Sequence, residues 1–142
     1  MRGSERYLDI AAYGVLDQNW IFDTLEDRVD DGVRVRVVVD QLSGDLFDWV
    51  PDNFVYDDTP RFAETLGNDA VVPDVGPNGR PRGGSIMHNK FVVADRKSVW
   101  LGSANFSATG VGAEYNANTS ILIKSPALAR IYANEFYQMH QK

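Results

Sequence analysis

Hydrophobic and polar positions follow two different periods in the first forty residues. Residues 7–13, YLDIAAY, form an apolar run that predicts a buried strand. A helix is predicted next, because the apolar residues Ile21, Leu25 and Val29 recur every four positions. Asp17 is expected to cap its start, and Gly32 to end it. Residues 33–39, VRVRVVV, predict a central strand. Strand, helix and strand in this order are typical of a parallel crossover unit, so an α/β fold is expected.

The later part of the chain predicts four more strands and two more helices. The strands are expected at residues 70–72, 86–94, 98–102 and 119–123, and the middle two are expected to pair as a hairpin across residues 95–97. One helix is predicted to begin at Thr59-Pro60 and to end at Gly67. The last helix begins at Ser125 and carries an apolar stripe: Leu128, Ile131, Tyr132, Phe136 and Met139.

Composition limits the kind of protein. With 142 residues, 44% of them hydrophobic and 24% charged, the chain is expected to form a single globular domain over residues 1–142. The absence of cysteine excludes a disulfide framework and a cysteine-based zinc site. Neither a signal peptide nor an apolar run of roughly 18 residues is visible, which favours a cytoplasmic location.

The net charge of −6 is unevenly distributed along the chain. Residues 1–79 hold six basic and seventeen acidic side chains, whereas residues 80–107 hold five basic side chains and one acidic side chain. An acidic body with one basic segment predicts a local anion-binding site, and argues against a surface built for nonspecific nucleic-acid binding. Arg96 and Lys97 are equally well explained as exposed turn residues.

The basic segment contains an unusual pair within the predicted strand 86–94. Side chains alternate along a strand, so His88 and Lys90 are expected to point the same way, about 7 Å apart. An isolated pair of this kind is more often a satisfied core histidine beside a lysine that reaches solvent. This pair is not isolated, because further polar and small residues follow at fixed spacing: Asp95, Gly102, Ser103 and Asn105.

Together these residues resemble the HKD motif of the phospholipase D superfamily, H-x-K-x4-D-x6-G-S-x-N, within residues 84–107. The resemblance is strongest over residues 84–139, where the flanks are similar to nuclease-like bacterial members, and it extends to the strand–helix–strand pattern of residues 7–40. It implies a phospholipase D-like α/β/α sandwich around a central mixed, largely parallel β-sheet.

The resemblance also implies a chemistry. His88 would attack phosphorus and form a phosphohistidine, while Lys90 and Asn105 hold the non-bridging oxygens. Gly102 would let the backbone come close to the phosphate, and Ser103 would donate a hydrogen bond there. No metal and no cofactor is implied, since lysine supplies the positive charge that a metal supplies elsewhere.

Two positions qualify this assignment. Asp95 belongs to the motif and is grouped with the catalytic residues, but its place at a strand end favours an orienting or structural role. Many family members carry an acid that orients the histidine where this chain has Ala117. Asn116, Asn118 and Glu114 are the candidates to replace it.

The chain carries one HKD motif, whereas the chemistry uses two facing H-x-K units. The other histidine, His140, has no such motif around it and is interpreted as a solvated residue at a helix end. Two arrangements supply the second unit: a homodimer with the active site across its two-fold axis, or a longer protein of which this chain is one half.

The expected activity is that of a metal-independent phosphodiesterase, and the resemblance of the flanks to nucleases favours a nuclease. The alternatives are a phospholipase D or phosphatidyltransferase acting on phospholipid headgroups, and an inactive phosphate-binding module. Exonuclease or endonuclease mode and strand preference do not follow from the sequence.

Two further segments are candidate substrate contacts. The loop 76–84 brings Arg80 and Arg82, which would contact the substrate backbone unless the loop is only a connector. Four aromatic residues would stack on bases, enter a lipid interface or cover the core: Phe47, Trp49, Phe54 and Tyr56.

Overall fold

A computed structural model describes the residues 1–13, 15–16, 19–40, 59–67, 70–74, 87–107, 110–111 and 116–141. The loop 76–84 and the aromatic residues between positions 47 and 56 lie outside these ranges. Within the described ranges, none of the helices has the length and apolar character needed to cross a bilayer.

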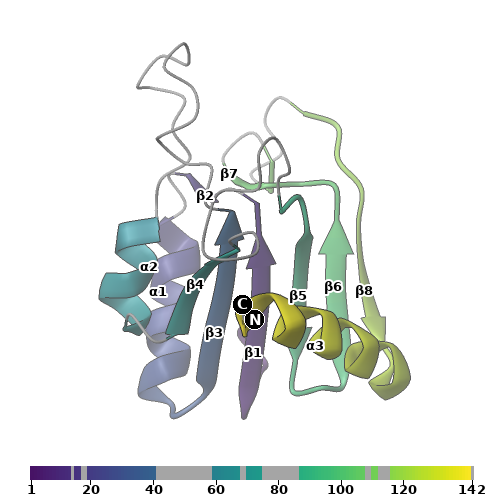
Figure 1. Cartoon of the computed structure of the whole chain (residues 1–142), viewed down its shortest axis with the longest axis horizontal. Coiled ribbons are helices and arrows are strands. Elements are labelled where there is room, and N and C mark those ends of the chain that lie inside the picture. Colours follow the sequence, from purple (N-terminus) through teal and green to yellow (C-terminus); the bar gives the residue numbers. More distant parts are fainter. Residues whose placement is uncertain are drawn as a thin grey trace.

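Six strands form the central sheet, in the order β4-β3-β1-β5-β6-β8 (Figure 1). Their bounds are β1 Tyr7–Ala12, β3 Arg34–Asp40, β4 Val71–Asp74, β5 Lys90–Ala94, β6 Ser98–Gly102 and β8 Ser120–Lys124. A separate short parallel pair, which the sequence did not predict, joins β2 (Val15–Leu16) to β7 (Phe106–Ser107).

The strand directions confirm an α/β fold with a mixed sheet, but the prediction of a largely parallel sheet is wrong. β3 is parallel to both β1 and β4, whereas the pairs β1–β5, β5–β6 and β6–β8 are antiparallel. A parallel pair needs a long crossover connection, which only the first half of the chain supplies with helices. The β5–β6 connection is the predicted three-residue turn, and so short a turn can only reverse the chain.

Helices cover both faces of the sheet. Helix α1 (Asn19–Asp30) packs on one face, and α2 (Thr59–Leu66) lies beside it against β3 and β4. Helix α3 (Pro126–His140) crosses the other face, in front of the strands in Figure 1. Alternate residues of each central strand supply the two cores. The α1 core includes Leu8, Ile10, Val35, Val37, Phe22 and Leu25, and the α3 core includes Val38, Phe91, Val93, Val99 and Phe136.

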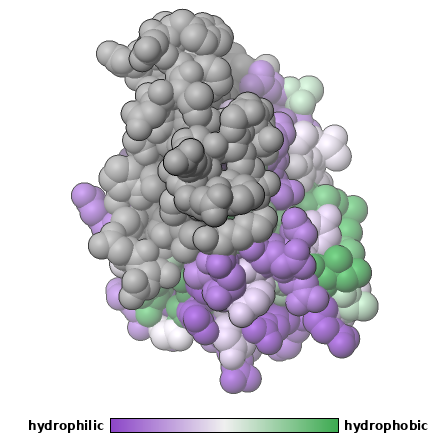
Figure 2. All heavy atoms as spheres, viewed as in Figure 1, coloured by the Kyte–Doolittle hydropathy of each residue, from purple (hydrophilic) through white to green (hydrophobic). Residues whose placement is uncertain are grey.

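The last helix is confirmed at its start but not along its whole predicted stripe. The Oγ of Ser125 accepts a hydrogen bond from the Leu128 amide at 3.3 Å, as expected of an N-cap. Ile131, however, is 65% exposed. The neighbouring edge strand β8 also leaves apolar side chains in solvent, Ile121 and Leu122, and Figure 2 shows hydrophobic surface on the side where Figure 1 places β8.

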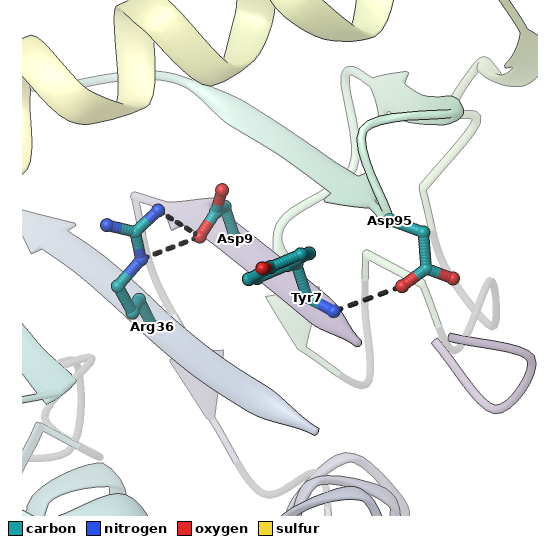
Figure 3. Close-up of polar contacts among 4 residues, drawn as sticks. All are labelled: Tyr7, Asp9, Arg36 and Asp95. Carbon is teal, nitrogen blue, oxygen red and sulfur yellow. Dashed lines mark hydrogen bonds and ion pairs between the residues drawn. The ribbon is translucent and has the colours of Figure 1, made fainter. Parts of the chain in front are cut away.

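A buried ion pair joins β1 to β3 beneath α3. Asp9 is 2% exposed and accepts from two guanidinium nitrogens of Arg36, Nη2 at 2.7 Å and Nε at 2.8 Å (Figure 3). The same guanidinium lies 5.0 Å from the ring centroid of Phe136 in α3. Asp9 and Arg36 thus compensate each other's charge in the sandwich interior while Arg36 packs against the covering helix.

The carboxylate of Asp95 fixes the N-terminal segment to the β5–β6 turn. It accepts hydrogen bonds from the amides of Glu5 at 3.0 Å, Arg6 at 2.8 Å and Tyr7 at 3.0 Å, the last drawn in Figure 3. Burial acts to raise the pKa of Asp95. The hydrogen bonds from Tyr7, Arg6 and Glu5 outweigh burial and hold this pKa below its ordinary value, aided by the charge of Lys97.

Asp95→Asn is expected to lower the free energy of unfolding by about 1–2 kcal/mol at pH 7, because a charged acceptor of several backbone hydrogen bonds is lost. A carboxylate with a lowered pKa stabilises the fold above its ordinary pKa of about 4, and this contribution disappears as pH falls through the lowered folded-state value. The difference in free energy of unfolding between wild type and Asp95→Asn should therefore become smaller as pH is lowered. Urea titrations at a series of pH values measure this difference.

The control for this prediction is Asp31→Asn. Asp31 pairs with Arg28 at 2.6 Å on the surface, where its side chain is 59% exposed, so the expected loss is below about 0.5 kcal/mol. An Asp95 variant no less stable than the Asp31 variant would contradict the anchoring role.

Candidate active site

The pairing of β5 with β1 sets the position of His88 and Lys90. Lys90 is the first residue of β5 and pairs with Ala12, the last residue of β1. The predicted strand 86–94 therefore starts too early: residues 87–89 precede the strand, and residue 86 is outside the described ranges. His88 lies just beyond the carboxyl end of β1 and is exposed, whereas Lys90 is 8% exposed.

The Lys90 side chain stays inside the molecule. Its Nζ donates to the carbonyl oxygen of His88 at 3.0 Å and lies 4.9 Å from the ring centroid of Tyr13. Burial lowers the pKa of the Lys90 ammonium, because water no longer solvates its charge fully. The interpretation as a lysine that reaches solvent does not describe this conformation.

The His88 imidazole rests against an aromatic ring. The ring centroids of His88 and Tyr13 are 4.6 Å apart and the planes meet at 65°, an edge-to-face contact. Partial burial lowers the pKa of His88, the charge of Lys90 lowers it further, and Asp40 opposes both. The neutral imidazole, with a free electron pair on one nitrogen, therefore predominates at pH 7.

Ser103 connects the motif to the segment ahead of β8. Its amide donates to the Thr119 carbonyl at 2.9 Å, its Oγ donates to Asn118 Oδ1 at 3.1 Å, and the same Oγ accepts from the Thr119 amide at 3.1 Å. The backbone carbonyl of Asn105 accepts from Val111 at 3.1 Å. The Oδ1 of Asn105 is buried and has no hydrogen-bond partner among the described residues.

A polar hollow of about 380 Å³ opens beside these residues. It is lined by Ser103, Asn105, Ser107, Gly110, Asn116, Ala117 and Asn118. Hydroxyl and amide groups dominate this lining, so its described residues offer neutral hydrogen-bonding groups and no cation. Such a lining suits the oxygens of a bound substrate whose charge is compensated by another group.

Two glycines allow close backbone contacts around the hollow. A Cβ on Gly102 would lie 2.6 Å from the Thr119 carbonyl oxygen and 2.8 Å from Ser120 Cβ, so Gly102 permits the approach of β8. A Cβ on Gly110 would collide with the carbonyl of Asn105. Gly110 was not singled out from the sequence, since nothing in its neighbours indicates contact with the motif.

The structure separates Asp95 from the other motif residues. Asp95 follows the far end of β5, seven residues from His88, which corresponds to roughly 20 Å along a strand. Its hydrogen bonds go to the N-terminal segment. This position favours the structural role considered from the sequence over a place in the reaction.

The described acid whose charge acts on His88 is Asp40, which the sequence did not suggest for the orienting role. Ala117 lines the polar hollow. Asn118 is bound to Ser103, and its Nδ2 lies 3.4 Å from the carbonyls of Gly110 and Asn116. Glu114 is outside the described ranges, as are the candidate substrate contacts Arg80 and Arg82.

The side chain that does contact His88, Tyr13, was treated in the sequence only as the end of a buried strand. The available signal was its position, because the last residue of a central strand lies at the sheet edge where side chains from several strands meet. The pairing with β5, which brings His88 to that edge, is not visible in the sequence.

The interpretation of His140 as a solvated residue is wrong. Its ring packs 5.4 Å from the ring of Phe136, and neither ring nitrogen has a hydrogen-bond partner in the described part of the chain. Burial lowers the pKa of His140, and Arg36 and Arg34 lower it further against the opposing effect of Asp9. His140 belongs to the packing beneath α3.

No group of three or more histidine, aspartate or glutamate side chains that could hold a metal ion occurs among the described residues.

Comparisons with known proteins agree on the fold. Nuc from Salmonella typhimurium, a phospholipase D family member, aligns at 17% identity with a TM-score of 0.68, covering 97% of this chain and 80% of its own. NucT from Helicobacter pylori aligns at 16% identity with a TM-score of 0.73, covering 99% and 82%. The archaeal chromatin protein TrmBL2 aligns at 13% identity and a TM-score of 0.56, covering 99% of this chain but 46% of its own.

No curated protein matches the sequence. The family model described as "Cardiolipin synthase, PLD-like domain" matches residues 1–140, almost the whole chain. This match, together with the fold shared with Nuc and NucT, shows that the chain belongs to the phospholipase D-like domain family.

Proposed function

We propose that this protein is a metal-independent phosphodiesterase that hydrolyses nucleic-acid phosphodiester bonds through a covalent phosphohistidine at His88. The observation that carries the proposal is an exposed, mainly neutral imidazole held beside a buried lysine ammonium. The imidazole supplies a nucleophile that the substrate can reach, and the ammonium supplies positive charge for the phosphoryl oxygens.

The reaction proceeds in two displacements. A nitrogen of His88 attacks phosphorus, the P–N bond forms, and the P–O bond to the leaving group breaks as a second, protonated imidazole donates its proton to the leaving oxygen. Water then attacks phosphorus, the P–N bond breaks, and the second imidazole accepts the proton of that water. The lowered pKa of His88 favours the neutral form that the first displacement needs.

Lys90 and Asn105 bind the non-bridging oxygens in this scheme. The ammonium of Lys90 compensates the charge that develops on the phosphoryl group. The Asn105 side chain and Ser103 come from the wall of the polar hollow, next to the point where β6 ends. Arg80 and Arg82 remain proposed contacts to the substrate backbone.

The second imidazole must come from another H-x-K unit, because the His140 ring at the end of α3 is packed against Phe136 with both its nitrogens buried. We assign it to a second copy of this chain in a homodimer; a second HKD half in a longer protein is the alternative. A two-fold axis through the site would place the two His88 side chains on opposite sides of one phosphate.

Nucleic acid is the proposed substrate because the chain shares its fold with Nuc, NucT and the DNA-binding TrmBL2, and because its motif lies in a basic segment. Phospholipid is the second candidate, favoured by a specific feature. An apolar hollow of about 630 Å³, whose lining includes Trp20, Val92, Trp100 and Leu122, shares Gly110 and Asn118 with the polar hollow. Acyl chains would fit an apolar hollow beside a phosphate site.

His88→Ala is expected to abolish cleavage of labelled single-stranded DNA in the presence of EDTA, lowering the rate at least about 10³-fold because the nucleophile is lost. The matched control is His140→Gln, which also removes an imidazole but should retain cleavage. Circular dichroism of both variants checks the fold. EDTA-sensitive cleavage, or equal cleavage by His88→Ala and wild type, would contradict the mechanism.

The same proteins assayed on cardiolipin or phosphatidylcholine vesicles distinguish the two substrates. Headgroup release that depends on His88, with DNA left intact, would overturn the nuclease assignment and retain the phosphohistidine chemistry. Binding of phosphate without cleavage of either substrate would favour an inactive phosphate-binding module.

Mixing wild type with an excess of His88→Ala tests the shared site. The two chains are unfolded and refolded together so that they pair at random. If the site is built from two copies, activity per wild-type chain should fall in proportion to the mole fraction of wild type, because most wild-type chains then have an inactive partner. Light scattering follows the dimer in parallel. Activity per wild-type chain that does not change with added variant would refute the homodimeric site.

A further inference from the structure

Tyr13 contacts both side chains that begin the motif, His88 and Lys90. Its ring makes the edge-to-face contact with His88 at 4.6 Å, and the Lys90 ammonium lies 4.9 Å from the same ring centroid. The Tyr13 ring thus contacts the proposed nucleophile and the proposed phosphate-binding cation at once.

The backbone holds Tyr13 and His88 in register with each other. The Tyr13 amide donates to the carbonyl oxygen of Asn89 at 3.1 Å, which continues the β1–β5 ladder by one step beyond the sheet. Asn89 in turn contacts Met139 Sδ in α3 through its Nδ2 at 3.6 Å. The chain neighbour of His88 is therefore fixed both to Tyr13 and to the covering helix.

We propose that Tyr13 is a positioning residue, whose ring fixes the orientation of the His88 imidazole and shields the Lys90 ammonium from water. The inference rests on the proposed function, since it assigns a role in that reaction. The Tyr13 ring, directly after β1, would then orient His88 in place of the acid expected where this chain has Ala117.

An aromatic ring suits this task differently from a carboxylate. A carboxylate beside His88 would raise the imidazole pKa and compete with the phosphate for Lys90, whereas the face of a neutral ring attracts the ammonium and leaves its charge uncompensated. Among the described residues, the charged groups that act on His88 are Lys90, which lowers its pKa, and Asp40 at the end of β3, which raises it. The Tyr13 ring leaves this balance on the side of the neutral nucleophile.

The test compares Tyr13→Leu with Tyr13→Phe, and uses Tyr137→Leu as the matched control, since Tyr137 is 54% exposed on α3. Single-turnover cleavage of DNA gives the rate of the chemical step, and KM is measured separately. Proton NMR follows the two imidazoles through a pH titration, with His88 assigned by comparison with His88→Ala.

Tyr13→Leu is expected to lower kcat about tenfold to a hundredfold, more than it raises KM, because the nucleophile is no longer held in line. In the same variant the His88 ring protons should lose the ring-current shift of Tyr13, and the His88 pKa should move up toward its ordinary value as burial is relieved. Tyr13→Phe keeps the ring and should restore both properties, while Tyr137→Leu should change neither.

A Tyr13→Leu variant with unchanged rate and unchanged His88 resonances would overturn the proposal. A Tyr13→Phe variant as impaired as Tyr13→Leu would also overturn it, because the hydroxyl group and not the ring would then be responsible for the effect. If the wild-type protein cleaves no phosphodiester, the proposed function fails, but the NMR titration still decides whether the Tyr13 ring holds the His88 imidazole.

Discussion

The antiparallel pairing of β5 on β1 is the constraint on which the site depends. Ala12 at the end of β1 pairs with Lys90 at the start of β5, so the lysine lies where both strands end. His88 lies one step beyond this point, and the Tyr13 ring contacts both side chains. A shift of one residue would exchange the two faces of β5, removing Phe91 from the α3 core and turning Lys90 toward α3. Core packing therefore determines where the reactive side chains lie.

Asp95 helps to hold β5 in this register with β1, from the opposite end of β5. Its carboxylate binds the amides of residues 5–7 just where β1 begins, so the start of β1 and the end of β5 are held together. A motif residue at the far end of β5 from His88 can in this way support the proposed site without touching a substrate. The spacing of the motif then reflects the length of β5 as much as the geometry of the phosphate site.

The site combines an exposed imidazole, the proposed nucleophile, with a cation that is partly withdrawn from water. Burying Lys90 costs stability, as its lowered pKa indicates, but a poorly solvated ammonium interacts more strongly with a phosphoryl group than one in bulk water. The Tyr13 ring and the His88 carbonyl compensate this burial without a negative charge.

The sequence predicted the helices and strands well, because each is marked by residue spacing and capping residues within its own short segment. The helix cap at Ser125, the helix start at Thr59, the hairpin across residues 95–97 and the strand–helix–strand start all appear in the structure, and the HKD spacing identified the family. Long-range pairing was not predictable. The antiparallel half of the sheet, the Tyr13–His88 contact and the packing of His140 against Phe136 depend on which strands and helices become neighbours, and no residue pattern encodes that directly.

The central claim is that His88 carries the phosphoryl group during the reaction. The most direct measurement is rapid alkaline quenching of a single turnover with DNA labelled at the scissile phosphate, followed by mass spectrometry of the peptide that contains residue 88. The account predicts a phosphoryl-linked adduct on His88 that is absent from His88→Ala and disappears as product forms. Product formation with no adduct on His88 at any time, or an adduct on another residue, would contradict it.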